Sequence, residues 1–476
     1  MPSPYALYAM AAIGVMGIVS AVRGLVDSDY YWHVTTGRLI VESGRVPTTD
    51  PFSFTWLGQP WTAHEWLGEV LIYLGVTGLG AGLAAFLFGA VAAGGPLLVG
   101  AALRRIGLRT GPVVLGVSLA LVVLLPYATI RPQVLSWLLL GGLLSGLILL
   151  RPEHGRWAWL LPPLFVLWAN LHGLYVIGLG VFAVYAIFAA IGRTPMSSRR
   201  IAVLLLLAVS VLATMLTPAG PAGLLYPLRY VEPGDWGLRH IAEWQMPSVT
   251  DARNLGLGLV ILALVLTRMR GTPAWLATVG VLGMLGALLA VRNGPLAAIA
   301  AVPAMTHGLA SIRPARPRRP PSPSMARGRR IMEAGLAALV VVAAVVILPG
   351  VEGLSGDRVI PQRFPVAATD ALGQVAPAAN TLAEYEWGGY LIYRLHDAGG
   401  HVFVDGRNDM YDQQILDDYL RIRNATPGWE ELADSYDVEA ILLPPGAAVV
   451  NAAAEAGWCE VHRDPVAVLL LRSCPA

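Results

Sequence analysis

Acidic and histidine side chains gather between residues 27 and 66 of this sequence. The segment opens with Asp27-Ser28-Asp29, continues through Trp32-His33, and closes with His64-Glu65-Trp66. An interfacial anchor would account for part of this pattern, since tryptophan and tyrosine suit a bilayer interface and acids stabilise helix N-termini. It accounts poorly for five such groups beside a membrane. The candidates are Asp27, Asp29, His33, His64 and Glu65.

A second set of polar residues sits at the ends of apolar stretches. Polar groups at membrane depth are costly unless they are paired or face a wet cavity. Any single one of them is more often a helix cap or a buried hydrogen-bonded residue, but the set predicts a shared cavity that opens outward. Its predicted lining is His33, Asn170, His172, Glu243 and Trp244, and its predicted phosphate ligands are Arg131, Arg239 and Arg292.

These residue types suit group transfer from a phosphate-linked donor. Arginine binds phosphate through a planar fork that stays charged. A carboxylate can take the proton of an attacking hydroxyl, and a phosphate leaves as an anion without needing a strong acid. The sequence has no Walker loop and no HExxH motif, and its two cysteines are too few for a thiolate metal site.

The elements that must position these groups are membrane helices. Charged residues make up 13% of the 476 residues, against about 25% in soluble proteins, and mean hydropathy is +0.60. A net charge of +2 implies no nucleic-acid surface. A span needs about 20 apolar residues. The candidate stretches are 5–22, 80–103, 111–129, 132–150, 157–170, 173–191, 201–217, 254–269, 273–291, 294–311 and 331–349.

Arginine orients these spans, because short cytoplasmic loops are rich in Lys and Arg. Seventeen of the 33 arginines lie on one side, seven of them in the Pro-rich linker 312–330. The pattern predicts a multi-pass protein of the plasma (inner) membrane with a cytoplasmic N-terminus and the first loop outside. The first stretch reads as an anchor, not a cleaved signal peptide, since it lacks a basic start.

Residues 350–476 predict a small extracytoplasmic α/β domain after the membrane domain 1–349. They hold 19 of the 31 acids and short β-rich runs such as 401–404 and 466–471. Cys459 and Cys474 flank a predicted turn at Asp464-Pro465. In an oxidising compartment they could form a disulfide across a hairpin. Two buried free thiols are the alternative.

The order of these features resembles the GT-C superfamily of integral-membrane glycosyltransferases. An acidic pair follows the first span, two interfacial helices fit near 29–42 and 62–77, many spans follow, and an outer domain ends the chain. The resemblance implies a polytopic helical fold of about 11 spans. It also implies sugar transfer from a polyprenyl-phosphate donor on the outer face, with inversion, and maps the family's acidic motif onto Asp27-Ser28-Asp29.

The outer domain loosely resembles the acceptor region of oligosaccharyltransferases. Their Trp-Trp-Asp-Tyr-Gly motif is matched only in part, because one tryptophan is missing and glycine stands at the aspartate position, so peptide N-glycosylation is not implied. A simple turn after a buried strand is the alternative for 405–409. The candidate acceptor residues are Glu386, Trp387, Tyr390, Asp405 and Arg407.

Three functional hypotheses follow. In the first, Asp29 is the general base or orients the acceptor, Glu65 and His64 support it, and a divalent cation (Mg or Mn) is held at Asp29 if one is used. The partners are then a polyprenyl-phosphate-linked sugar, the bilayer, and a glycan, lipid or protein acceptor. The second hypothesis is a transporter or flippase for lipid-linked sugars, and the third is a non-catalytic membrane assembly protein.

Overall fold

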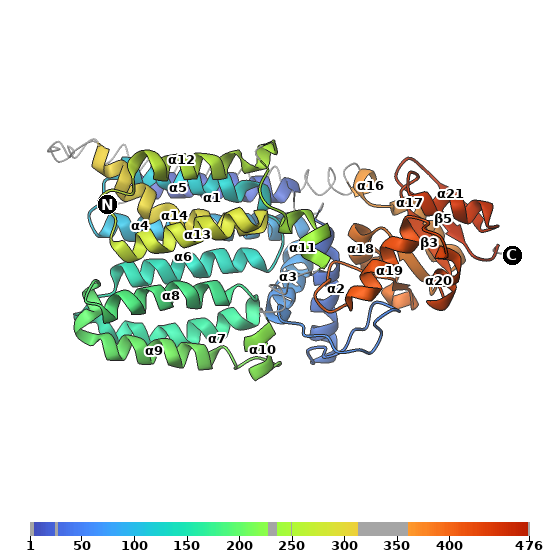
Figure 1. Ribbon diagram of the computed structural model, residues 1–476, viewed down its shortest axis with the longest axis horizontal. Coiled ribbons are helices and arrows are strands. Elements are labelled where there is room, and N and C mark those ends of the chain that lie inside the picture. The colour runs from blue at the N-terminus through green and yellow to red at the C-terminus, as the bar shows by residue number, and fades with distance from the viewer. Residues whose placement is uncertain (1–3, 24–26, 227–235, 249, 313–359, 475–476) are drawn as a thin grey trace. The chain divides into compact units, whose positions relative to one another are not determined.

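The computed structural model describes residues 4–23, 27–226, 236–248, 250–312 and 360–474 (Figure 1). The described residues form two compact units, the first drawn from 1–22, 82–227 and 240–349 and the second from 23–81, 228–239 and 350–476. The first loop (27–65) therefore belongs with the C-terminal domain. The predicted linker beyond residue 312, the predicted span 331–349 and the predicted boundary at 349/350 lie outside the described residues.

The first unit is a bundle of helices that run alongside one another (Figure 1). Each overlaps one of the predicted stretches between 5 and 311, and the predicted number of 11 spans stays a prediction. Among the described residues, five segments are long and apolar enough to cross a membrane: Pro4–Arg23, Ala81–Arg105, Thr110–Tyr127, Pro195–Ala213 and Val291–Ile312. The helices are α1 Pro4–Arg23, α4 Ala81–Arg105, α5 Thr110–Leu124, α6 Gln133–Leu149, α7 Leu161–Leu171, α8 Tyr175–Ala190, α9 Arg200–Ala213, α12 Leu255–Thr267, α13 Ala274–Leu289 and α14 Gly294–Ile312.

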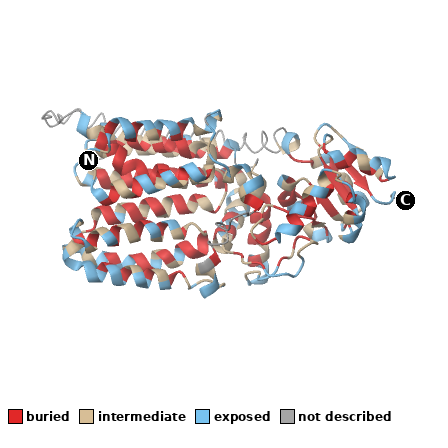
Figure 2. Cartoon of the chain, viewed as in Figure 1, coloured by how far each residue is buried: buried red, intermediate tan, exposed pale blue. Residues whose placement is uncertain are grey.

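Small residues let these helices pack closely. A side chain at Gly141 of α6 would overlap the backbone of Gly95 in α4, so the two helices touch through their main chains. Such contacts are typical of membrane helices, where apolar lipid gives little hydrophobic drive for association. In Figure 2 the buried residues, in red, lie on the facing sides of the helices. Outward leucines such as Leu266 (71% exposed) and Leu289 (66%) suit a lipid environment. The chain is thus an integral multi-pass membrane protein.

Two helices of the second unit carry the first loop's polar residues. They are α2 Ser28–Ser43 and α3 Trp66–Leu79, close to the two helices expected from the sequence. Asp27 caps α2, accepting a hydrogen bond from the Asp29 N–H at 3.1 Å, and Gly44 ends it in the left-handed conformation (φ 66°). A side chain at Gly37 would overlap the Glu69 carbonyl oxygen. The two helices therefore pack backbone to backbone.

The rest of the second unit is a five-stranded sheet with helices around it (Figure 1). The strand order is β2-β1-β3-β5-β4, with β1 parallel to β2 and β3, and β5 antiparallel to β3 and β4. Strands β3 and β5 are buried throughout because they lie inside the sheet. The strands are β1 Asn380–Ala383, β2 His401–Val402, β3 Ala440–Leu443, β4 Cys459–Arg463 and β5 Val468–Leu471. The helices are α16 Ile360–Arg363, α17 Val366–Val375, α18 Gly388–Leu395, α19 Gln413–Arg423, α20 Trp429–Ser435 and α21 Ala448–Glu455.

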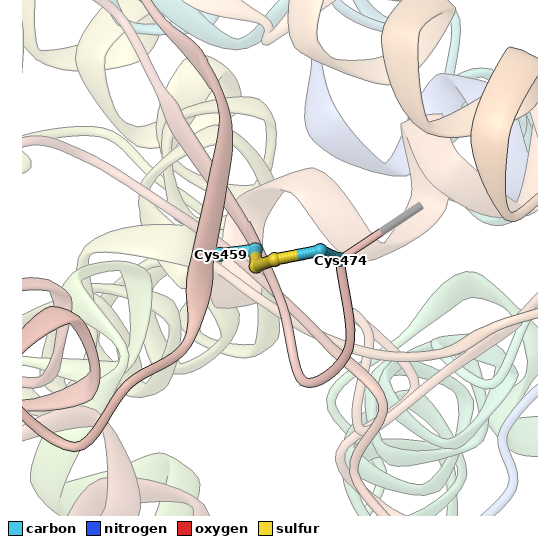
Figure 3. The surroundings of a disulfide bond; sticks show 2 residues. All are labelled: Cys459 and Cys474. Carbon is cyan, nitrogen blue, oxygen red and sulfur yellow. A yellow bond between two sulfur atoms is a disulfide. The ribbon is translucent and has the colours of Figure 1, made fainter. Parts of the chain in front are cut away.

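The last two strands form a hairpin with a disulfide. Asp464 accepts hydrogen bonds from the Val466 and Ala467 N–H groups at 2.7 and 2.8 Å, which closes the turn between the strands. Cys459 and Cys474 are bonded, with their Cα atoms 5.3 Å apart (Figure 3). The bridge closes a loop of 15 residues and ties the end of the described chain to β4.

Candidate active site

Part of the first loop extends the C-terminal sheet. Ser53 forms a parallel bridge with Val402 of β2. The Phe54 N–H donates to the Val402 carbonyl at 3.1 Å, and the Val402 N–H donates to the Phe52 carbonyl at 3.2 Å. Thr55 Oγ1 also donates to the Phe403 carbonyl at 2.6 Å. These bonds satisfy an otherwise open sheet edge, and they fix the loop to the strand that leads into Asp405.

A buried ion cluster of Asp50, Asp405 and Arg407 locks this junction. Arg407 Nη1 lies 2.8 Å from Asp50 Oδ1, and Nη2 lies 2.6 Å from Asp405 Oδ2. At most 1% of each of the three side chains is exposed. The guanidinium also lies over the rings of Phe52 and Trp61, 4.8 and 4.6 Å from their centroids. Paired charges and aromatic faces together replace the water that a buried arginine loses.

Each carboxylate in this Arg407 cluster has further partners. Asp50 accepts hydrogen bonds from the N–H groups of Phe52 and Ser53 at 3.0 and 3.1 Å, and from the Ser53 hydroxyl. Asp405 accepts from the Tyr411 hydroxyl at 2.8 Å. Burial raises the pKa of Tyr411, which keeps its hydroxyl protonated as a donor. Burial alone would lower the pKa of Arg407, but the charges of Asp405 and Asp50 raise it.

Asp29 lies in the first turn of α2, against the turn that precedes Arg407. A Cβ built on Gly406 would overlap Asp29 Oδ1 and would lie 3.2 Å from the Trp32 indole nitrogen. A Cβ on Gly389 would lie 2.7 Å from the Ser28 carbonyl oxygen. The structure thus brings together two predicted regions, the first-loop acids and the Asp405-to-Arg407 turn. Asp27 acts locally as the cap of α2.

The predicted residues His33, His64 and Glu65 come together with Glu69, forming what we term the His–Glu cluster. His33 Nε2 lies 3.7 Å from Glu65 Oε2, and His33 Nδ1 lies 3.5 Å from Glu69 Oε1. His64 Nε2 lies 3.4 Å from Glu65 Oε1. Only 1% of Glu69 is exposed. Its place in the sequence, four residues after Glu65 and thus on the same helical face, is the signal that could have marked it.

Protonation in this cluster follows from burial and neighbouring charge. Burial raises the pKa of Glu69, with the negative charge of Glu65 adding to the effect. Burial would lower the pKa of His64, but its hydrogen bond to Glu65 and the charges of Glu65 and Asp409 raise it to about 9. His64 is therefore a cation at neutral pH. Burial also raises the pKa of Asp409.

No group of three or more His, Cys, Asp or Glu residues poised to hold a metal occurs among the residues that the structure describes. The cation predicted at Asp29 therefore stays a prediction. The carboxylates of Asp29 and Glu65 are oxygen donors of the kind that Mg²⁺ and Mn²⁺ prefer.

Four predicted residues of the first unit meet in a second polar site. Arg131 Nη1 lies 3.0 and 3.1 Å from the two carboxylate oxygens of Glu243. Arg292 lies over the Trp244 ring, 4.1 Å from its centroid. The charge of Arg131, with a smaller contribution from Arg292, lowers the pKa of Glu243. Arg131, just before α6, and Arg292, in the turn before α14, thus come from distant segments to flank one carboxylate.

The other predicted cavity residues bond to the backbone. Asn170 Nδ2 donates to the carbonyls of Val166 and Leu216 at 2.8 and 2.9 Å, and His172 Nδ1 accepts from the Leu174 N–H at 3.0 Å. These bonds fit the alternative of hydrogen-bonded residues at helix ends. Arg239 belongs to the second unit, is 52% exposed, and lies 3.9 Å from Asp417.

The predicted acceptor residues divide between core and surface. Trp387 is buried and donates its indole N–H to the Arg363 carbonyl at 3.0 Å. Tyr390 is buried, with its ring 5.0 Å from that of Tyr31 in α2. Glu386 is 66% exposed and lies 3.8 Å from Arg363. Trp387 and Tyr390 therefore pack within the unit, and the Asp405–Arg407 pair belongs to the buried Arg407 cluster.

Comparisons with known proteins bear on the whole architecture. No family model matches the chain, and no curated protein matches it. Among solved structures, it is similar to the archaeal oligosaccharyltransferase AglB from Archaeoglobus fulgidus, determined with an inhibitory peptide and a dolichol-phosphate. That match has a TM-score of 0.58 and 11% identity over 93% of this chain and 70% of AglB.

The chain is also similar to ArnT from Cupriavidus metallidurans in the apo state, with a TM-score of 0.53 and 16% identity over 96% of this chain and 95% of ArnT. Both are membrane glycosyltransferases of the GT-C superfamily. The bundle of apolar helices, the first loop with its acids, and the C-terminal sheet together have the same fold as these two proteins.

Proposed function

We propose that this protein is a membrane glycosyltransferase that moves a sugar from a polyprenyl-phosphate-linked donor to a hydroxyl acceptor. The observation that carries the proposal is the position of Asp29, held at the start of α2 against the turn before Arg407. The GT-C fold supports the general kind of reaction. The arginine pattern of the loops supports an acceptor on the outer face, with the C-terminal domain extracytoplasmic.

The chemistry needs a base and a stabilised leaving group. The acceptor oxygen attacks the anomeric carbon and loses its proton to Asp29, while the bond from that carbon to the phosphate oxygen breaks. The polyprenyl phosphate leaves as an anion, and attack from the opposite side inverts the anomeric carbon. Arg131 and Arg292 are assigned to hold the phosphate, since guanidinium groups stabilise the charge that develops on it. Arg131 would then exchange the Glu243 carboxylate for the phosphate as its anionic partner.

The His–Glu cluster supports Asp29 from α2 and α3. His33 lies one helical turn after Asp29, on the same face of α2. Its two ring nitrogens lie close to the carboxylates of Glu65 and Glu69. A cationic His64 offsets the charge of Glu65 at neutral pH. We assign these groups to hold the electrostatic field around Asp29, and we assign Asp29 as the ligand of a divalent cation if the reaction uses one.

The test replaces the proposed base with its isosteric amide. The full chain, in detergent with added membrane lipids, would be given a panel of polyprenyl-phosphate-linked hexoses and pentoses. Release of polyprenyl phosphate and the glycosylated product are both measured. We expect Asp29→Asn to lower turnover by about 10²–10⁴-fold, the usual contribution of a general base. Asp412→Asn, which changes an exposed carboxylate of the same unit, is the matched control and keeps wild-type turnover.

Three results would contradict the proposed function or favour one of the alternatives. Near-normal turnover by Asp29→Asn would contradict the proposed base. Movement of the lipid-linked sugar across liposomes without any covalent product would favour the transporter reading. An unchanged phenotype for first-loop variants, together with loss of function on disrupting the C-terminal domain, would favour a non-catalytic assembly role.

A further inference from the structure

The C-terminal domain touches the proposed catalytic segment through glycines. At Gly406 a Cβ would overlap Asp29 Oδ1, and at Gly389 a Cβ would lie 2.7 Å from the Ser28 carbonyl oxygen and 3.1 Å from Trp32 Cδ1. Any side chain at these two positions would therefore occupy the space of residues 28–32. The missing side chains allow the domain to approach the start of α2.

The turn of residues 405–407, which faces Asp29, is held in place by buried interactions. Arg407, directly after Gly406, bonds to Asp405 through its backbone N–H at 2.9 Å and through Nε at 2.8 Å. Its Nη1 reaches Asp50 at 2.8 Å, and all three side chains are almost fully buried. A guanidinium held by two carboxylates and two rings leaves the preceding residue little freedom to retreat.

We propose that Gly406 and Arg407 are positioning residues for the Asp29 carboxylate. Arg407 fixes the turn, and the absent side chain of Gly406 leaves the carboxylate the space for its reactive orientation. This inference rests on the proposed role of Asp29 as the base. It makes the C-terminal domain a part of the catalytic centre, whatever else that domain binds.

The contact between Gly406 and Asp29 distinguishes a positioning role for Gly406 from a role in folding. Gly406 is not among the glycines with a left-handed backbone, so alanine fits its conformation. The atom nearest to an added methyl is the end of the Asp29 side chain, which can rotate away, and the next residue that it would meet is Trp32, whose indole nitrogen lies 3.2 Å away. At Gly388, by contrast, an added methyl would lie 2.6 Å from the Val404 carbonyl oxygen, so that substitution would disturb the backbone itself.

The experiment compares Gly406→Ala with Gly446→Ala in the full chain. Gly446 lies in the same domain, and a Cβ there would meet nothing within 4 Å, so the control adds the same methyl without a contact. The assay is release of polyprenyl phosphate from the most active donor of the panel. We expect Gly406→Ala to lower kcat by about 100-fold, the usual cost of misplacing a reacting group by about 1 Å. Its KM should stay within about twofold of the control and its melting temperature within about 3 °C.

A double-mutant cycle tests whether Gly406 acts through Asp29. In the Asp29→Asn background, adding Gly406→Ala should change the residual turnover by less than about twofold, because the carboxylate it displaces is no longer present. Arg407→Lys, which keeps the charge but loses the planar fork, should lower kcat by about 10-fold and leave KM unchanged.

Several results would overturn the inference. One is a kcat for Gly406→Ala equal to that of Gly446→Ala. Another is an independent, multiplicative loss in the Asp29→Asn background. A melting temperature lowered by more than about 5 °C would assign Gly406 a folding role instead. If Asp29→Asn alone keeps normal turnover, the proposed role of Asp29 as the base is wrong. That outcome differs from a failure of the present inference, because it is seen without any change at Gly406.

Discussion

Replacing Asp50 tests whether the buried Arg407 cluster holds the first loop to the C-terminal domain. Asp50→Ala removes the 2.8 Å ion pair to Arg407 and the acceptor for two backbone N–H groups. Removing one partner from a buried ion pair costs about 3–5 kcal/mol, and each stranded N–H costs about 1–3 kcal/mol. Arg407 keeps its bonds to Asp405, so we take the low ends of these ranges and expect a loss of about 5 kcal/mol.

Asp50→Asn makes the same test with a milder change. The amide keeps one oxygen for the backbone N–H groups and removes only the charge, so we expect a loss of about 1–2 kcal/mol. In a unit of this size each kcal/mol moves the melting temperature by about 2–4 °C. The alanine variant should therefore melt about 10–20 °C lower than wild type, and the asparagine variant about 2–8 °C lower.

The assay needs to measure the loss of stability and to show which part of the protein loses it. Thermal melts followed by tryptophan fluorescence give the shift. Hydrogen exchange followed by mass spectrometry should show lost protection at 52–55 and 402–404, where the loop pairs with the sheet, and unchanged protection in peptides of α5 and α14. A shift below about 2 °C for alanine would show that the Asp50 side chain does not hold this junction. Equal shifts for alanine and asparagine would show that its charge holds the junction and that its bonds to the backbone N–H groups contribute nothing.

Two further predictions concern the disulfide and pH. Replacing Cys459 and Cys474 by serine opens a 15-residue loop and should cost about 3 kcal/mol, measured as a lower melting temperature that added reductant reproduces in wild type; no effect of either treatment would refute a stabilising bridge. The His64 pKa of about 9 in the folded protein exceeds the unfolded value near 6.5. Its stabilisation, about 3 kcal/mol, is therefore complete below pH 6.5 and lost as pH rises through 9. The melting temperature of wild type minus that of His64→Gln should fall across that window, and a difference independent of pH would contradict the raised pKa.

Short-range sequence patterns predicted most of the helices and the C-terminal hairpin. The apolar stretches between 5 and 311 reappear as helices because a span is defined by its own hydropathy, whatever its neighbours are. The two helices of the first loop appear at 28–43 and 66–79 for a similar reason, since helix signals such as the Asp27 cap of α2 act within a few residues. The hairpin turn at Asp464 is equally local, closed by hydrogen bonds to residues two and three positions later.

Local patterns were less informative where a residue's partner decides its role. Asn170 and His172 stay predictions as cavity residues, and the structure adds that both bond to backbone groups. Trp387 and Tyr390 resembled an acceptor motif, but they pack in the core of the second unit. A polar or aromatic side chain near a surface element can face either way, and its sequence position does not tell which.

By itself, the sequence determined the membrane helices, the acidic first loop and the small C-terminal domain, because hydropathy, charge and turn chemistry are short-range properties. Only the tertiary structure decided that Asp50 meets Arg407 across 357 positions, that residues 52–55 extend the sheet beside β2, and that Gly406 faces Asp29. Contacts of that kind depend on the path of the chain between the partners, and neither partner's neighbours in the sequence encode it. Asp29 and the residues proposed to position it therefore lie in two segments that are far apart in the sequence, and folding brings these segments together.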